Sequence, residues 1–144
     1  MHSVLIVDDE AGIRTILTRW LTAGGYDVRA AENAETAMDA MAAAPADVVM
    51  CDVVMPGHDG LWLAAELHKH YPTAGLILAT GLDSVPPTSS MRPGIVEYIV
   101  KPFDPDDVRR CVASAARWHD DAVKRGPVAP VVEGALDKWF ADKR

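Results

Sequence analysis

The residues of this chain that could do chemistry each follow a short apolar run directly, and they are Asp8, Asp9, Asp52, Thr80 and Lys101. Carboxylates about 4 Å apart repel each other by roughly 4 kcal/mol per pair at an effective dielectric near 20, so three gathered acids need compensating charge. A divalent cation supplies that charge, and Mg²⁺ suits a site with oxygen ligands, few carboxylates and several waters. These residue types therefore predict a magnesium site, provided that the fold brings them together.

A carboxylate beside bound Mg²⁺ can act as a nucleophile toward phosphorus, while the metal and a lysine neutralise the phosphoryl oxygens. Asp52 is the best candidate for the nucleophile because it ends the most central apolar run, residues 48–51. We expect Lys101 to pair with the phosphoryl group and the Thr80 hydroxyl to donate a hydrogen bond to it. The chemistry predicted is transfer of a phosphoryl group onto Asp52.

The apolar runs that precede these residues predict the strands that position them. Residues 4–7, 48–51, 76–79 and, more weakly, 98–100 are apolar without polar alternation, and residues 26–31 read as a more polar fifth strand at an edge. Strands that are apolar on both faces belong in a parallel sheet covered by helices on both sides. Because ligands bind at the carboxyl ends of such strands, we expect the five polar residues to share one crevice.

Between the runs, apolar residues recur at the spacing of a helix, in residues 13–21, 34–41, 63–71 and 108–115. Asn33 and Asp104 are placed to cap two of these helices, and Pro105 suits the first turn of the last. The alternation predicts an α/β fold, a flavodoxin-like doubly wound five-stranded parallel sheet with helices on both faces. Three prolines in residues 82–94 predict that a fourth helix there is short or irregular.

Length and charge narrow the possible functions. The 144 residues predict one domain, residues 1–125, followed by a proline-rich connector and short amphipathic C-terminal helix in residues 126–144. With 14 Lys and Arg against 21 Asp and Glu, the formal charge of -7 disfavours nucleic acid as a partner. No apolar stretch approaches bilayer length, and the two cysteines suggest neither zinc nor a disulfide, so we expect a cytoplasmic protein without membrane contact.

The motifs, taken in order, resemble those of the receiver domains of two-component response regulators, similar in plan to the chemotaxis receiver. They are Val4–Glu10, Asp52–Gly60, Ala79–Gly81 and Tyr98–Phe103. Together they cover most of the chain to about residue 125. The absence of a full-size second domain in the sequence suggests a stand-alone receiver.

The resemblance implies a role for each matching residue. Asp52 matches the acid that a histidine kinase phosphorylates, and Asp9 matches the acid that binds Mg²⁺ directly together with Asp52. Asp8 matches an acid that acts through a metal-bound water, and the backbone carbonyl of Val54 matches the remaining metal ligand. The other matches are a pair that switches position on phosphorylation, Thr80 and Tyr98, and a pair joined by a cis peptide, Lys101 and Pro102.

The resemblance also implies partners: a sensor histidine kinase or phosphotransfer protein as donor, and a downstream protein target. The chain is expected to be a monomer or weak homodimer, and not an enzyme beyond its own phosphorylation and dephosphorylation. An alternative is a receiver-fold adaptor that works without phosphorylation, which the uncertain fourth helix suggests. A hydrolase with an aspartyl nucleophile is weaker, since Val54 stands where such enzymes carry a second aspartate.

Overall fold

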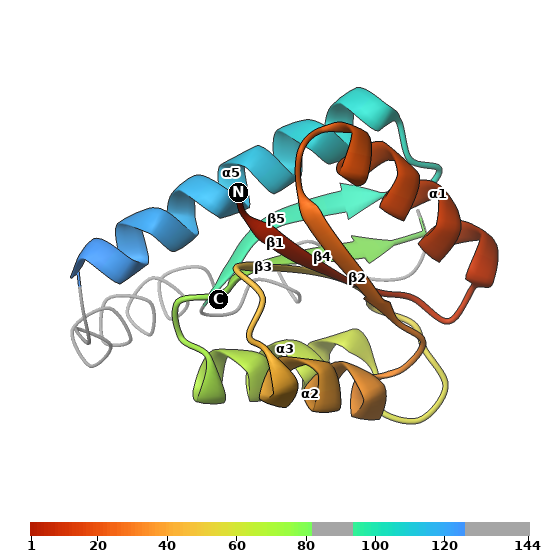
Figure 1. Cartoon of the computed structure of the whole chain (residues 1–144). Helices are drawn as coiled ribbons and strands as arrows, with labels where there is room; N and C mark the ends of the chain where they lie inside the picture. Colours follow the sequence, from red (N-terminus) through yellow and green to blue (C-terminus); the bar gives the residue numbers. More distant parts are fainter. Residues whose placement is uncertain (82–93, 126–144) are drawn as a thin grey trace, which may run out of the picture.

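Strands and helices alternate through residues 1–81 and 94–125, which are the residues that the computed structural model describes (Figure 1). The strands are β1 (Ser3–Val7), β2 (Asp27–Ala31), β3 (Val48–Asp52), β4 (Gly75–Thr80) and β5 (Ile95–Val100). The helices are α1 (Ala11–Ala23), α2 (Ala34–Ala43), α3 (Gly60–His70) and α5 (Pro105–Arg125). The fourth helix expected in residues 82–94, and the connector and helix expected in 126–144, lie outside the described residues, apart from Gly94.

The five strands form one parallel sheet in the order β2-β1-β3-β4-β5, which confirms the predicted fold. The register aligns the carboxyl ends of the four strands that precede the candidate residues. Val7 pairs with Cys51, Asp52 with Ala79, and Thr80 with Val100. The residues that end or follow these strands are therefore brought to the same edge of the sheet.

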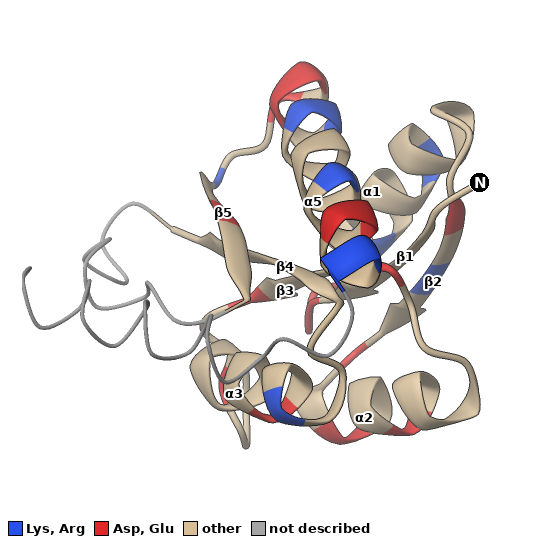
Figure 2. Ribbon diagram, turned by 90° about the vertical axis from the view of Figure 1, so that its left-hand side faces the viewer, with Lys and Arg blue, Asp and Glu red and all other residues tan. Residues whose placement is uncertain are grey.

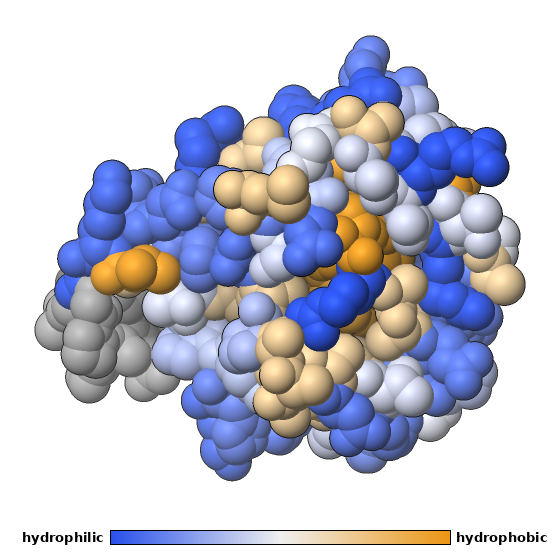
Figure 3. Space-filling model, in the orientation of Figure 1, coloured by the Kyte–Doolittle hydropathy of each residue, from blue (hydrophilic) through white to orange (hydrophobic). Residues whose placement is uncertain are grey.

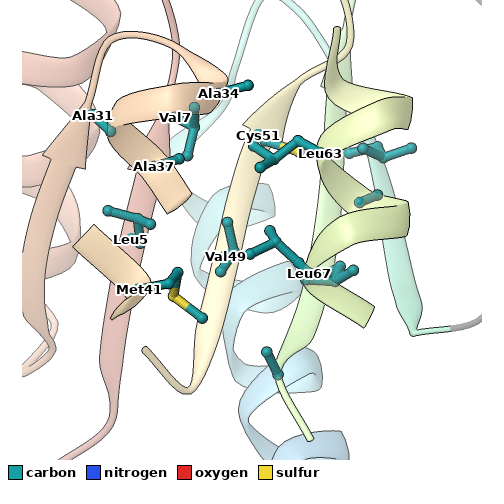
Figure 4. Packing of buried hydrophobic residues seen from close by; sticks show 14 of the residues in the cluster. Leu5, Val7, Ala31, Ala34, Ala37, Met41, Val49, Cys51, Leu63 and Leu67 are labelled. Carbon is teal, nitrogen blue, oxygen red and sulfur yellow. The ribbon is translucent and has the colours of Figure 1, made fainter. Parts of the chain in front are cut away.

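Helices cover both faces of the sheet: α2 and α3 lie on one side, and α1 and α5 on the other (Figure 1). Successive residues of a strand point to opposite faces. In β3, Val49 and Cys51 join the core cluster under α2 and α3, whereas Val48 and Met50 join the cluster under α1 and α5. Figure 4 shows the first of these clusters, with strand side chains directed at the two helices. Burial on both faces is why the strand sequences lack polar alternation.

The helix starts follow the capping residues of the sequence. Asn33 accepts a hydrogen bond from the Thr36 amide at 2.8 Å, and the Thr36 hydroxyl accepts one from the Asn33 amide at 3.2 Å, so α2 begins with a capping box. At the start of α5, Asp104 accepts a hydrogen bond from the Asp107 amide at 3.3 Å. In contrast, the N-cap residue of α1, Glu10, makes no side-chain hydrogen bond to the helix.

The charged residues are distributed differently among the helices. Along α5 acidic and basic residues are interspersed, and α2 carries only acidic ones (Figure 2). On the face shown in Figure 3, hydrophobic residues reach the surface only in small separate areas. Within residues 1–81 and 94–125, no helix combines the length and the apolar character needed to cross a bilayer.

Candidate functional site

Buried polar residues mark the carboxyl edge of the sheet. In the described part of the chain, the polar side chains classed as buried are Asp8, Asp52 and Thr80, which are 3%, 5% and 1% exposed. Asp8 directly follows β1, and Asp52 and Thr80 are the last residues of β3 and β4, so all three lie at the same end of neighbouring strands. Burying a polar or charged group costs free energy unless it is bonded. Polar groups that are buried at a cost to stability are expected at functional sites. Because three of them lie at this edge of the sheet, this edge is the candidate site.

The Lys101 ammonium lies between the acids. Its Nζ is 3.1 Å from Asp52 Oδ2, 3.2 Å from Asp8 Oδ2 and 3.7 Å from Glu10 Oε1. Burial lowers the pKa of this ammonium, but its hydrogen bonds to Asp52 and Asp8 outweigh the effect, so its pKa is raised overall. One cation thus serves two buried carboxylates, and the site keeps an excess of negative charge.

Three consecutive acids, Asp8, Asp9 and Glu10, form a compact group between β1 and α1. Their carboxylate oxygens lie within 4.8 Å of one another. Asp8 is buried, and Asp9 and Glu10 are exposed. Such a donor set offers only oxygen ligands, which fits a hard divalent cation such as Mg²⁺. Sequence reasoning missed Glu10, although its place directly after the two aspartates was an available signal.

The Asp52 carboxylate is held by two contacts. Oδ1 accepts a hydrogen bond from the Val54 amide at 3.2 Å, and Oδ2 accepts one from Lys101 at 3.1 Å. Burial raises the pKa of the Asp52 carboxyl and Asp8 adds to the rise, whereas Lys101 and the Val54 amide oppose it; the balance is a raised pKa. The charged form of Asp52 is therefore a cost to the fold in the absence of a further cation.

This cost predicts that Asp52→Asn stabilises the metal-free protein at neutral pH. Below the ordinary Asp pKa of 3.8, the carboxyl is protonated in both the folded and the unfolded state, so the cost is absent. The cost of the Asp52 charge grows as the pH rises from 3.8 to above the raised pKa of the folded state. At higher pH the cost no longer changes. Denaturant unfolding in chelator across this pH range should show a stability advantage of the variant that vanishes in acid. The exposed Asp39→Asn should show no such trend.

Thr80 carries a buried hydroxyl without a hydrogen-bond partner in the structure. Its backbone carbonyl accepts a hydrogen bond from the Lys101 amide at 2.7 Å, which ties the ends of β4 and β5 together. An unbonded buried hydroxyl is costly, and one at the same sheet edge as buried acids is available to donate to a ligand. The hydroxyl fits an incoming oxyanion.

Tyr98 and the residues after β5 complete the expected set. Tyr98 is partly buried and packs against the core cluster under α2 and α3, and its strand neighbour on β4 is Leu78. The peptide bond between Lys101 and Pro102 is cis. The Val54 side chain, by contrast, is 60% exposed. The structure therefore brings Lys101 into direct contact with Asp8 and Asp52. Tyr98 lies on β5, the strand that Lys101 follows.

Two further residues, Arg14 and Gly60, shape the site without being singled out by the sequence. The Arg14 guanidinium donates a hydrogen bond to the Asp8 carbonyl at 2.8 Å, and the Gly60 amide donates one to the Val53 carbonyl at 2.8 Å. Burial, with Asp52 and Asp59, raises the pKa of the Cys51 thiol to about 12, which keeps it protonated and inert. A glycine eight residues after Asp52 was visible in the sequence, but its contact was not.

Curated relatives match most of this chain but extend well beyond it. Regulatory protein AtoC of Escherichia coli is 33% identical over 116 residues, which are 80% of this chain and 25% of the relative. The DNA-binding transcriptional regulator NtrC of Escherichia coli is 34% identical, with 82% and 25% covered. Transcriptional regulatory protein AruR of Pseudomonas aeruginosa is 37% identical, with 96% and 59% covered. The chain thus spans between a quarter and three fifths of the length of these relatives.

Solved structures and a family model agree with these relatives. A receiver domain protein from Clostridium thermocellum superposes with a TM-score of 0.75 at 25% identity, covering 81% of this chain and 95% of that one. The receiver domain of NtrX from Brucella abortus gives 0.75 at 29%, covering 79% and 98%. The family model of the response regulator receiver domain matches residues 4–113, from β1 into α5. With buried acids, a threonine and a lysine at one sheet edge, this chain belongs to the response regulator receiver domains, the phosphorylation-dependent modules of two-component signalling.

Proposed function

We propose that Asp52 is the phosphoryl acceptor of this receiver domain, with Mg²⁺ as the cofactor. The observation that carries the proposal is the pair of bonds from Lys101 to Asp52 and Asp8, beside a buried and unbonded Thr80 hydroxyl. Asp8, Asp9, Asp52 and the Val54 carbonyl would hold the metal. When bound, Mg²⁺ would supply positive charge to the phosphoryl oxygens in the transition state.

Asp52 is positioned to attack because its two oxygens are already oriented. A bond forms between an Asp52 carboxylate oxygen and phosphorus, and the bond between phosphorus and a histidine nitrogen of the donor breaks. The electron pair of that bond returns to the imidazole. Lys101 then exchanges its contact with the Asp52 carboxylate for one with a phosphoryl oxygen, and the Thr80 hydroxyl donates to another. The Thr80 hydroxyl thereby gains the hydrogen-bond partner that it lacks in the unmodified site, and Lys101 keeps a charged partner.

Signalling follows from the movement of these groups. A phosphoryl group adds about -1.5 to -2 charges, which draws Thr80 and Lys101 inward. Tyr98, on the strand next to Thr80, is proposed to change position with it. The altered surface would then bind a downstream protein target. We propose no catalysis beyond the domain's own phosphorylation and dephosphorylation, and no observation favours the phosphorylation-independent adaptor.

Phosphoryl transfer from a histidine to Asp52 also indicates the partners that we propose for this chain. The donor is a sensor histidine kinase or a phosphotransfer protein that carries a phosphohistidine, and the location is the cytoplasm, where such kinases draw on ATP. We propose that residues 1–125 form the receiver domain. We propose a monomer or weak homodimer, which exchanges partners without nucleic acid or membrane contact.

Peptide mapping by mass spectrometry tests the acceptor. Incubating the chain with a small phosphodonor and Mg²⁺ should place a phosphoryl group on the peptide that contains Asp52. Labelling should disappear in excess chelator, because the acidic site then lacks the cation that offsets its charge. A label found on Asp8 or Asp9, or equal labelling with and without chelator, would contradict the proposal.

A further inference from the structure

Arg14, in the first turns of α1, makes a contact that the reaction described above does not use. Its Nη1 donates a hydrogen bond to the backbone carbonyl of Asp8 at 2.8 Å, across the turn that carries the acidic group. The side chain is partly buried in this position. The guanidinium thus binds the turn through a main-chain oxygen and makes no contact with the Asp8 carboxylate oxygens.

This bond completes a set that fixes Asp8 on all sides. The Asp8 amide donates to the Ala31 carbonyl at 3.2 Å, and its Oδ1 accepts from the Glu10 amide at 2.9 Å. Its Oδ2 meets Lys101 at 3.2 Å. Arg14 supplies the remaining contact, to the carbonyl. Every polar atom of Asp8 therefore has a defined partner, and the orientation of the turn is determined.

The acidic turn needs these restraints because its own negative charges oppose its conformation. Three consecutive carboxylates within 4.8 Å repel one another. The N-cap residue of α1, Glu10, makes no side-chain hydrogen bond to the helix, and the first turn of α1 carries no acid. Repulsion alone would favour a turn in which the carboxylates spread apart. A cation bonded to the backbone of the turn opposes that spreading and keeps the carboxylates together before any metal arrives.

We propose that Arg14 is a positioning residue for the divalent cation, holding the Asp8–Glu10 turn in the geometry that binds it. The proposal rests on the function proposed above, since it concerns the same Mg²⁺ site. The proposal predicts whether removing Arg14 weakens or strengthens Mg²⁺ binding. If Arg14 acted only as a nearby positive charge, its removal would strengthen Mg²⁺ binding, because like charges repel. A positioning role requires that removal weaken Mg²⁺ binding.

Isothermal titration calorimetry of the unphosphorylated chain with MgCl₂ measures whether Mg²⁺ binding becomes weaker or stronger. Arg14→Met keeps the aliphatic stem and removes the charge and the donors; we expect its Kd for Mg²⁺ to rise by about tenfold, as for other residues that orient metal ligands. Arg14→Lys, which keeps a single donor, should recover part of the affinity. Arg19→Met removes an exposed arginine from the same helix and should stay within about twofold of the unmodified chain.

Further titrations distinguish a failure of the Arg14 proposal from a failure of the proposed Mg²⁺-dependent function. The unmodified chain should bind Mg²⁺ and Asp9→Asn should not; absence of binding by the unmodified chain would overturn both proposals. Unchanged or tighter Mg²⁺ binding by a folded Arg14→Met would overturn the positioning role alone. If Arg14→Met does not fold, Arg14→Gln carries the same expectations.

Discussion

Replacing Asp52 by Asn is expected to lower phosphorylation of this chain by at least about 10³-fold, to the background of other carboxylates. The amide is nearly the same size as the carboxylate, and it can still accept the Val54 amide bond seen at 3.2 Å. What it lacks is the nucleophilic oxygen and the charge that a metal and Lys101 require. The measurement is incorporation of labelled phosphoryl from a small phosphodonor at saturating Mg²⁺.

Stability distinguishes this loss from simple unfolding. The raised pKa of the Asp52 carboxyl implies that its charge burdens the metal-free fold at neutral pH, so the inactive variant should be more stable than the parent. Exposed Asp39→Asn, on α2, should keep both the normal rate and the normal stability. Full labelling of Asp52→Asn would show that another residue is the acceptor, and loss of labelling with loss of stability would point to a structural effect instead.

Gly60→Ala is expected to cost about 3 kcal/mol of folding free energy or more, and to reduce phosphorylation of the folded protein by about 10²-fold. A Cβ at this position would overlap the Asp52 carbonyl oxygen and lie 2.8 Å from Val53 Cα. Both neighbours are backbone atoms, which no side-chain rotation can move away. Either α3 or the end of β3 must shift, and the Gly60 hydrogen bond to the Val53 carbonyl is stretched.

Two other glycines provide matched controls. A Cβ at Gly75 would lie 2.5 Å from the Ala115 carbonyl oxygen on α5, an overlap at the opposite end of β4 from Thr80. Gly75→Ala should therefore destabilise the fold while the folded fraction is phosphorylated at nearly the normal rate. Nothing lies within 4 Å of a Cβ at Gly12, in α1, so Gly12→Ala should stabilise by roughly 0.5–1 kcal/mol.

Denaturant unfolding and initial rates of phosphorylation, measured on all three variants, separate the two effects of Gly60. The interpretation requires that the rate fall in Gly60→Ala and not in Gly75→Ala at equal stability. Equal rates in the two would mean that the backbone behind Asp52 adjusts without disturbing the site.

The elements were predictable because each leaves a local pattern in the chain. Residues 48–51 are apolar without a break since β3 is covered on both faces, and Asn33 caps α2 because a side-chain oxygen must satisfy an unpaired amide there. Both features depend on residues a few positions apart. The composition of the site could be read in the same way, since Asp52 and Thr80 end their strands and Lys101 directly follows its own.

The sequence by itself thus determined the α/β fold, the parallel sheet and the polar residues at its carboxyl edge. Only the tertiary structure decided which of them touch: that Lys101 bridges Asp52 and Asp8, that Glu10 joins the acidic group, and that Arg14 holds the turn behind it. Apolar periodicity reports which face of an element is buried, but it carries no information on strand register or side-chain rotamer. Contacts of about 3 Å between distant residues depend on both, so they appear only when the chain is folded.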